Sequence, residues 1–170
     1  METNITPAEN ASNKEIFWQY YNTIRPKFTG FASLLDFHLT DIGDGYAKGK
    51  ILAGEVHMNN ASLKVVHGAV ISFLCDSVMG LACWELFFDG MRSSTLELHT
   101  HYLSPVKLGE LMECEAKIIH RGKSHVLLVA DVFVGARKVA HSSATFNVWT
   151  PKEDMYKAKE YQQQKQQSKL

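Results

Sequence analysis

The segment from Gly68 to about Phe87 constrains this chain most, because apolar residues occupy nearly every face of a helix drawn through it. A helix that is apolar on all sides is buried rather than laid on a surface. We therefore expect one long central helix covered by the rest of the chain. Asp76 stands within this segment, where an unpaired charge is unfavourable, so a neighbour must hold it or chemistry must use it.

Strand patterns flank the predicted helix on both sides. Before it, residues 34–42 and 46–52 alternate loosely around Gly43-Asp44-Gly45, which is typical of a hairpin turn. After it, short turns separate four candidate strands, at residues 94–103, 111–120, 125–134 and 138–149. Short returns favour antiparallel neighbours. This order predicts an α+β fold in which an antiparallel sheet wraps around one long central helix.

The two ends of the chain differ from its middle. Ser12 or Asn13 caps a predicted helix that ends near Arg25, just before Pro26. The last residues are polar and rich in glutamine. We therefore divide the chain into an N-terminal extension with a helix (residues 1–33), one domain (34–150) and a polar tail (151–170).

Composition narrows the function classes. Eighteen basic residues balance eighteen acidic ones, so bulk charge favours neither a nucleic acid nor an anionic membrane as partner. Asp76 and Glu85 interrupt the longest apolar stretch, which predicts no membrane span. Three cysteines without regular spacing fit a reducing compartment, and the polar N-terminus lacks the pattern of a secretory signal. We expect a cytoplasmic protein.

Three motifs occur in a specific order. The first runs from His67-Gly68-Ala69-Val70-Ile71 to Leu74-Cys75-Asp76-Ser77-Val78-Met79-Gly80, the second covers Thr100 to Glu110, and the third covers Ile118 to Ser124. Together they resemble hotdog-fold acyl-CoA thioesterases of the phenylacetate-pathway type, over residues 34–149. The resemblance implies a hotdog fold and hydrolysis of an acyl-CoA thioester to free acid and CoA. It also implies a homodimer, assembled as a dimer of dimers, and no cofactor beyond the coenzyme A of the substrate.

The resemblance gives four residues a catalytic role. Asp76 would be the nucleophile or the general base. The Gly68 N–H, at the start of the helix, would donate to the oxyanion that forms on the substrate. His67 would position this loop rather than act as a base, and Thr95 would help to position water. In the family, the helix start and the carboxylate come from opposite subunits.

The substrate-binding candidates lie in or near the motifs: Asn60, Ser94, Arg121, Gly122, Lys123 and Ser124. The cations of Arg121 and Lys123 suit the phosphates of coenzyme A. The chain departs from the family pattern upstream of His67, where Ala61 replaces an asparagine. Asn59 or Asn60 would have to supply that amide.

Other interpretations remain open at this level. Asp76 could be an ordinary buried polar residue, and the turn at Arg121 and Lys123 a solvated hairpin tip. His99 and His101 share a strand face with Glu97, but we expect no metal there. The alternatives to hydrolysis are a non-catalytic module that binds acyl-CoA or an acyl carrier, and a hotdog dehydratase or hydratase.

Overall fold

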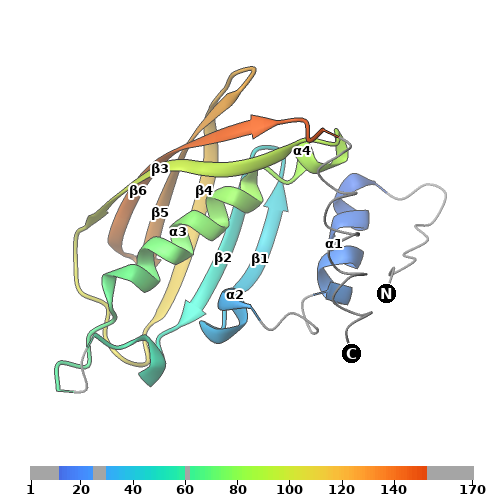
Figure 1. Ribbon diagram of the computed structural model, residues 1–170. Coiled ribbons are helices and arrows are strands. Elements are labelled where there is room, and N and C mark those ends of the chain that lie inside the picture. Colours follow the sequence, from blue (N-terminus) through green and yellow to red (C-terminus); the bar gives the residue numbers. More distant parts are fainter. Residues whose placement is uncertain (1–11, 25–29, 60–61, 153–170) are drawn as a thin grey trace, which may run out of the picture.

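A curved antiparallel sheet of six strands packs around one long helix in the computed structural model, which describes residues 12–24, 30–59 and 62–152 (Figure 1). The strands are β1 (His38–Gly43), β2 (Tyr46–Leu52), β3 (Arg92–Tyr102), β4 (Leu111–Arg121), β5 (His125–Val134) and β6 (Arg137–Trp149). They lie in the order β1-β2-β4-β5-β6-β3, with every neighbouring pair antiparallel. The predicted α+β arrangement is confirmed.

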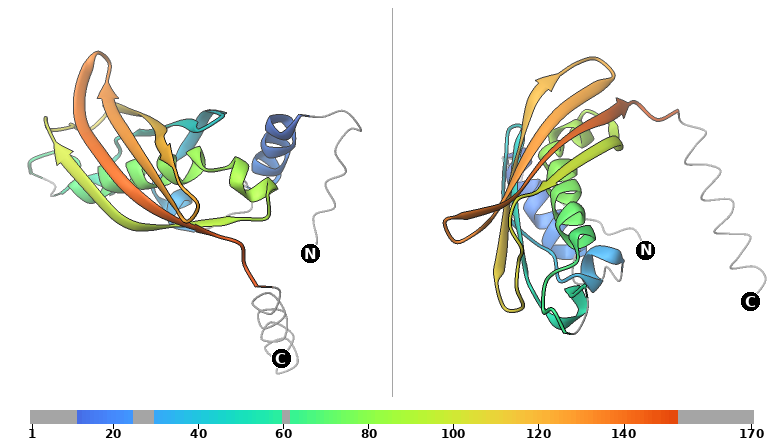
Figure 2. Two further views of the ribbon diagram at one scale, coloured as in Figure 1. Left: turned by 90° about the horizontal axis from the view of Figure 1, so that it is seen from above. Right: turned by 90° about the vertical axis from the view of Figure 1, so that its left-hand side faces the viewer.

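The long helix, α3 (Gly68–Ala82), lies across one face of the sheet and contacts all six strands (Figure 2). Its inward stripe is apolar and buried: Val70, Ile71, Leu74, Cys75, Val78, Met79 and Ala82. Strand residues alternate between the core and the outer face, as in β6. One stripe of α3 is not covered by the sheet, and it includes the half-buried Asp76 and Gly80.

Two predicted boundaries were wrong. The central helix was expected to continue to about Phe87, but α3 ends at Ala82 and a separate turn, α4 (Glu85–Phe88), follows. The helix breaks because Trp84 is turned into the core, where its indole Nε1–H donates to the Gly43 carbonyl at 2.9 Å. The strand expected from residue 34 begins only at His38, because Phe31–Leu34 form a short helix, α2.

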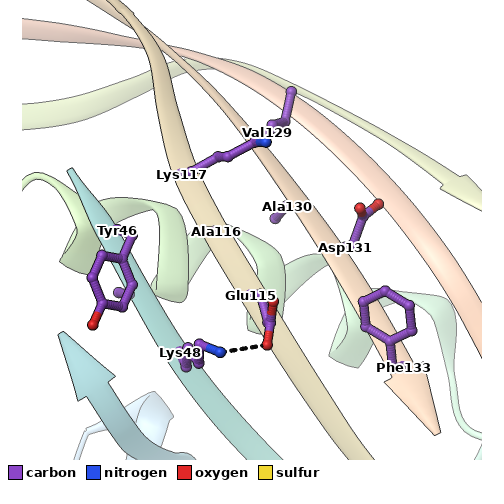
Figure 3. Close-up of a pocket in the computed structure, with 10 residues that line it drawn as sticks. Tyr46, Lys48, Glu115, Ala116, Lys117, Val129, Ala130, Asp131 and Phe133 are labelled. Carbon is purple, nitrogen blue, oxygen red and sulfur yellow. Dashed lines mark hydrogen bonds and ion pairs between the residues drawn. The ribbon is translucent and has the colours of Figure 1, made fainter. Parts of the chain in front are cut away.

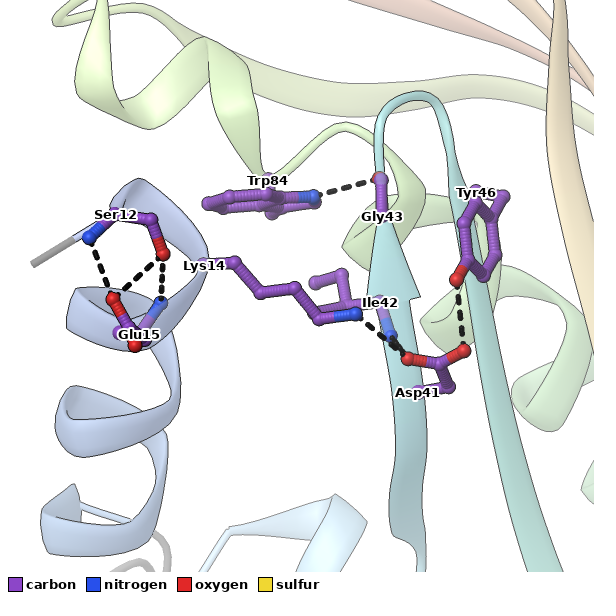
Figure 4. Close-up of polar contacts among 8 residues, drawn as sticks. All are labelled: Ser12, Lys14, Glu15, Asp41, Ile42, Gly43, Tyr46 and Trp84. Carbon is purple, nitrogen blue, oxygen red and sulfur yellow. Dashed lines mark hydrogen bonds and ion pairs between the residues drawn. The ribbon is translucent and has the colours of Figure 1, made fainter.

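The N-terminal helix, α1 (Asn13–Ile24), is fixed against the edge of the sheet (Figure 4). Ser12 caps it: the Glu15 carboxylate accepts the Ser12 N–H at 2.7 Å, and Ser12 Oγ accepts the Glu15 N–H at 3.4 Å. Lys14 reaches Asp41 of β1 at 3.1 Å. The helix thus covers part of the β1 edge.

Some predictions fall on residues outside the described ranges. These are the helix end at Arg25, the amide at Asn60, and the tail from residue 153 onward. The division into extension, domain and tail therefore stays a prediction. No helix within the described ranges is both long and apolar enough to cross a membrane.

Candidate active site

Asp76, on the uncovered stripe of α3, contacts Thr95 of β3. The Thr95 hydroxyl donates a hydrogen bond to Asp76 Oδ1, with 2.6 Å between the oxygens. Asp76 is half-buried and Thr95 is exposed, so solvent reaches this pair of side chains. A carboxylate held by one hydroxyl and open on one side can accept a proton from water or attack an electrophile.

A β-bulge brings Thr95 to this position. Strict alternation along β3 would place Thr95 on the same face as Glu97, but the register with β6 shifts between these two residues. Thr95 therefore pairs with the inward Phe146, whereas Glu97 pairs with Thr145 on the outer face. Bulges commonly redirect a side chain beside an active site. The same shift sends Ser94, the neighbour of Thr95, to the opposite face, away from Asp76.

The second part of the site is the start of α3. His67 is the N-cap residue, and its Nδ1 accepts the Ala69 N–H at 3.0 Å. Because Nδ1 is the acceptor, a neutral His67 carries its proton on Nε2. The Gly68 N–H has no acceptor among the residues that the structure describes. A free N–H at the positive end of a 15-residue helix is suited to an oxyanion.

Tyr102, to which sequence analysis assigned no role, is a neighbour of this helix start. Its hydroxyl donates to the Gly68 carbonyl at 3.2 Å and lies 2.7 Å from Ser72 Oγ. A Cβ on Gly68 would lie 3.0 Å from the Tyr102 ring, so any larger residue there would have to displace this exposed ring by a few tenths of an ångström. The available signal was the strand alternation, which puts Tyr102 and Thr100 on the face toward α3.

The remaining predicted residues lie apart within one chain. Gly68 and Asp76 are eight residues apart, or about 12 Å along the helix axis. The register runs from Thr95 through Phe146 and Val126 to Arg121, so the turn at Arg121 lies three strands away, about 14 Å. Gly122, Lys123 and Ser124 form that turn on the surface. One chain therefore holds two separated halves of a site.

Other features of the described residues offer weaker chemistry. A hollow of about 270 Å³ on the outer face of the sheet is crossed by the Lys48–Glu115 ion pair (Figure 3). No three histidine, cysteine or acidic side chains gather there or elsewhere in the described ranges to hold a metal. Burial raises the pKa of the Cys83 thiol to about 11, which disfavours a thiolate nucleophile.

Comparison with known proteins relates the site segment to one family. The family model described as "Thioesterase superfamily" matches residues 63–141, the segment that contains Gly68, Asp76 and Thr95. Over this segment the chain is similar to the thioesterase superfamily. A protein from Archaeoglobus fulgidus, described as a candidate esterase, is 28% identical over 62% of this chain and 66% of its own length.

Solved structures confirm the hotdog thioesterase fold. A conserved protein from Pseudomonas aeruginosa is 30% identical, with a TM-score of 0.65 over 72% of this chain and 95% of that one. The PaaI protein of the Escherichia coli phenylacetic acid operon shares the fold at 18% identity, with a TM-score of 0.69 over 80% and 95%. A thioesterase-like protein from Streptococcus pneumoniae, solved with coenzyme A, is 21% identical, with a TM-score of 0.61 over 69% and 91%.

Proposed function

We propose that the protein hydrolyses acyl-CoA thioesters at sites formed between two copies of the chain. The observation that carries this proposal is the Asp76–Thr95 hydrogen bond in an open stripe of α3, within a segment similar to the thioesterase superfamily. The coenzyme A bound to the Streptococcus pneumoniae structure supports a CoA-type substrate.

A second copy of the chain could bring together the two halves of the site, which lie apart within one chain. Strand β3 is an edge of the sheet and exposes Leu96 at 57%, whereas α1 covers part of the other edge, at β1. An open edge strand is a template for pairing with another chain. Pairing at β3 would place the Gly68 end of one helix near Asp76 of the other, as the family resemblance implies. Each dimer would then hold two composite sites, and two dimers could associate further.

In this site, Asp76 of one copy attacks the thioester carbonyl carbon directly or removes a proton from the water that attacks it. The new C–O bond forces the carbonyl electrons onto oxygen, and the Gly68 N–H of the other copy stabilises that oxyanion. Collapse breaks the C–S bond, and the CoA thiolate leaves and takes up a proton. On the direct route, water then hydrolyses the acyl-aspartyl anhydride. Both routes yield the free acid and CoA, without any further cofactor.

We assign Arg121, Gly122, Lys123 and Ser124 to the nucleotide end of the substrate. Two exposed cations in one turn suit phosphate groups, and a turn 14 Å or so from Thr95 leaves room for the long pantetheine arm. This length argues that the turn binds far from the reacting carbonyl rather than beside it.

Thiol release from a panel of acyl-CoA esters tests the proposal. We expect turnover by the wild-type protein and a loss of at least a hundredfold in kcat for Asp76→Asn, which keeps the shape of the side chain. Glu97→Gln is the matched control, because Glu97 lies on the outer face of the sheet. Binding of acyl-CoA without turnover would instead support a non-catalytic module. Hydration of an enoyl-CoA would support the dehydratase class.

A further inference from the structure

An apolar hollow of about 570 Å³ lies between α1 and the far end of α3. Phe17 and Tyr20 of α1 form one wall, and Leu81, Trp84 and Phe88 form the other. Among the lining residues that the structure describes, Arg92, at the start of β3, is the only one with a charge. Its size is that of a small-molecule pocket, and its lining suits a hydrocarbon rather than a polar group.

The walls of this hollow are held in place. The rings of Phe17 and Trp84 lie 5.4 Å apart, and the Leu39 N–H of β1 donates to the Tyr21 hydroxyl at 3.1 Å. Trp84 is fixed from behind by its bond to the Gly43 carbonyl (Figure 4). The hollow is therefore preformed, which reduces the entropy lost when a flexible ligand binds.

Two elements connect the hollow to the Asp76–Thr95 pair. On α3, Leu81 follows Asp76 by five residues, or about 8 Å along the axis, and Trp84 lies just beyond the end of the helix. On β3, Arg92 precedes Thr95 by three residues, or about 10 Å. Both elements thus run from the carboxylate to the hollow.

Gly80 lies between the two places. It follows Asp76 by one helical turn and is half-buried, and a Cβ there would meet nothing closer than the Phe146 ring at 3.5 Å. Glycine inside a helix is less stable than alanine, although the space for a methyl group exists. Glycine at this position adds no side chain to the face of α3 between Asp76 and the hollow.

We propose that this hollow, with α1 as its outer wall, holds the distal part of the substrate's acyl chain, so that the protein prefers medium- and long-chain acyl-CoA esters. An extended chain advances about 1.25 Å per C–C bond of 1.5 Å, so it needs about six carbons to reach Leu81 and more than that to pass Trp84. Acetyl and butyryl groups stop short of the hollow. This inference rests on the proposed hydrolysis.

Chain-length profiles test it. Across acetyl-, hexanoyl-, decanoyl- and palmitoyl-CoA, kcat/KM rises once the chain enters the hollow, by up to about fourfold per buried methylene. Tyr20→Lys, at a position 53% exposed, should lower the ratio of decanoyl to acetyl kcat/KM at least tenfold. Ile119→Lys, at a position 56% exposed on β4, is the matched control and should leave this ratio as in the wild type.

A binding measurement separates this inference from the proposed hydrolysis. Calorimetry with the non-hydrolysable thioethers S-ethyl-CoA and S-dodecyl-CoA should show tighter binding of the dodecyl compound, and Tyr20→Lys should remove most of that difference. Thioester turnover with a flat chain-length profile, or a profile unchanged by Tyr20→Lys, would overturn the acyl-chain assignment. Absence of turnover together with Tyr20-dependent binding of S-dodecyl-CoA would overturn hydrolysis while supporting the pocket.

Discussion

Removal of the Thr95 hydroxyl is the most informative single change. Thr95→Val keeps the β-branched shape that suits strand β3 and deletes only the group that donates to Asp76 at 2.6 Å. A hydrogen bond to a charged group contributes about 1.5–3 kcal/mol. If that energy positions the carboxylate for reaction, kcat/KM falls about ten- to 150-fold, since each 1.36 kcal/mol is tenfold.

The sheet supplies a matched control. Thr145 donates to Glu97 at 2.8 Å, which is the same threonine–carboxylate bond on the outer face, one position beyond the bulge. Thr145→Val should leave kcat/KM within twofold of the wild type, measured by thiol release at the same protein and salt concentration. Urea unfolding checks that both variants are folded. Equal losses in the two variants, or a Thr95→Val protein as active as the wild type, would refute the assigned role.

Three further predictions concern binding and stability. Lys123→Glu should raise KM for CoA esters at least fivefold and Lys117→Glu, on strand β4, should not; an unchanged KM counts against the phosphate turn. Burial and a hydrogen bond with Asp44 raise the pKa of Glu85 in the folded protein. The protonated carboxyl therefore stabilises the folded state at low pH, and this stabilisation is lost as the pH rises through the raised pKa. Glu85→Gln should therefore raise Tm at pH 7 but not at pH 4, and equal gains at both would contradict this. Trp84→Phe should lower the free energy of unfolding by about 2–3 kcal/mol in urea, because it leaves the Gly43 carbonyl without its donor and a void where the indole ring was. A decrease below half that range would argue against a stabilising Trp84–Gly43 hydrogen bond.

Periodicity in the sequence was enough for most of the fold. The strands predicted at residues 125–134 and 138–149 match β5 and β6 within one residue, because their apolar alternation is regular. The helix end at Ala82 was not predictable in this way. Trp84 continues the apolar pattern of the helix. The reason why the helix stops is its hydrogen bond to Gly43, a residue at the end of β1 that is distant in the sequence.

The candidate site likewise depends on contacts between distant residues that periodicity does not predict. Asp76 stood out by local chemistry, as a charge within an apolar segment. Thr95 came only from the resemblance, because alternation along β3 would have placed it on the outer face without the bulge. Tyr102 received no role, since its contact with Gly68 joins residues 34 positions apart and depends on how the strand crosses the helix.

Subunit complementation tests the central claim, that Asp76 and the Gly68 N–H act together across two chains. Asp76→Asn removes the carboxylate, and Gly68→Pro removes the N–H at the first helical position, where proline is well accepted. Each variant alone should be inactive as a homodimer. In a heterodimer purified through two different tags, one of the two sites combines an intact Asp76 with an intact Gly68. We expect about half the wild-type kcat per dimer for this heterodimer, and an inactive heterodimer would refute shared sites.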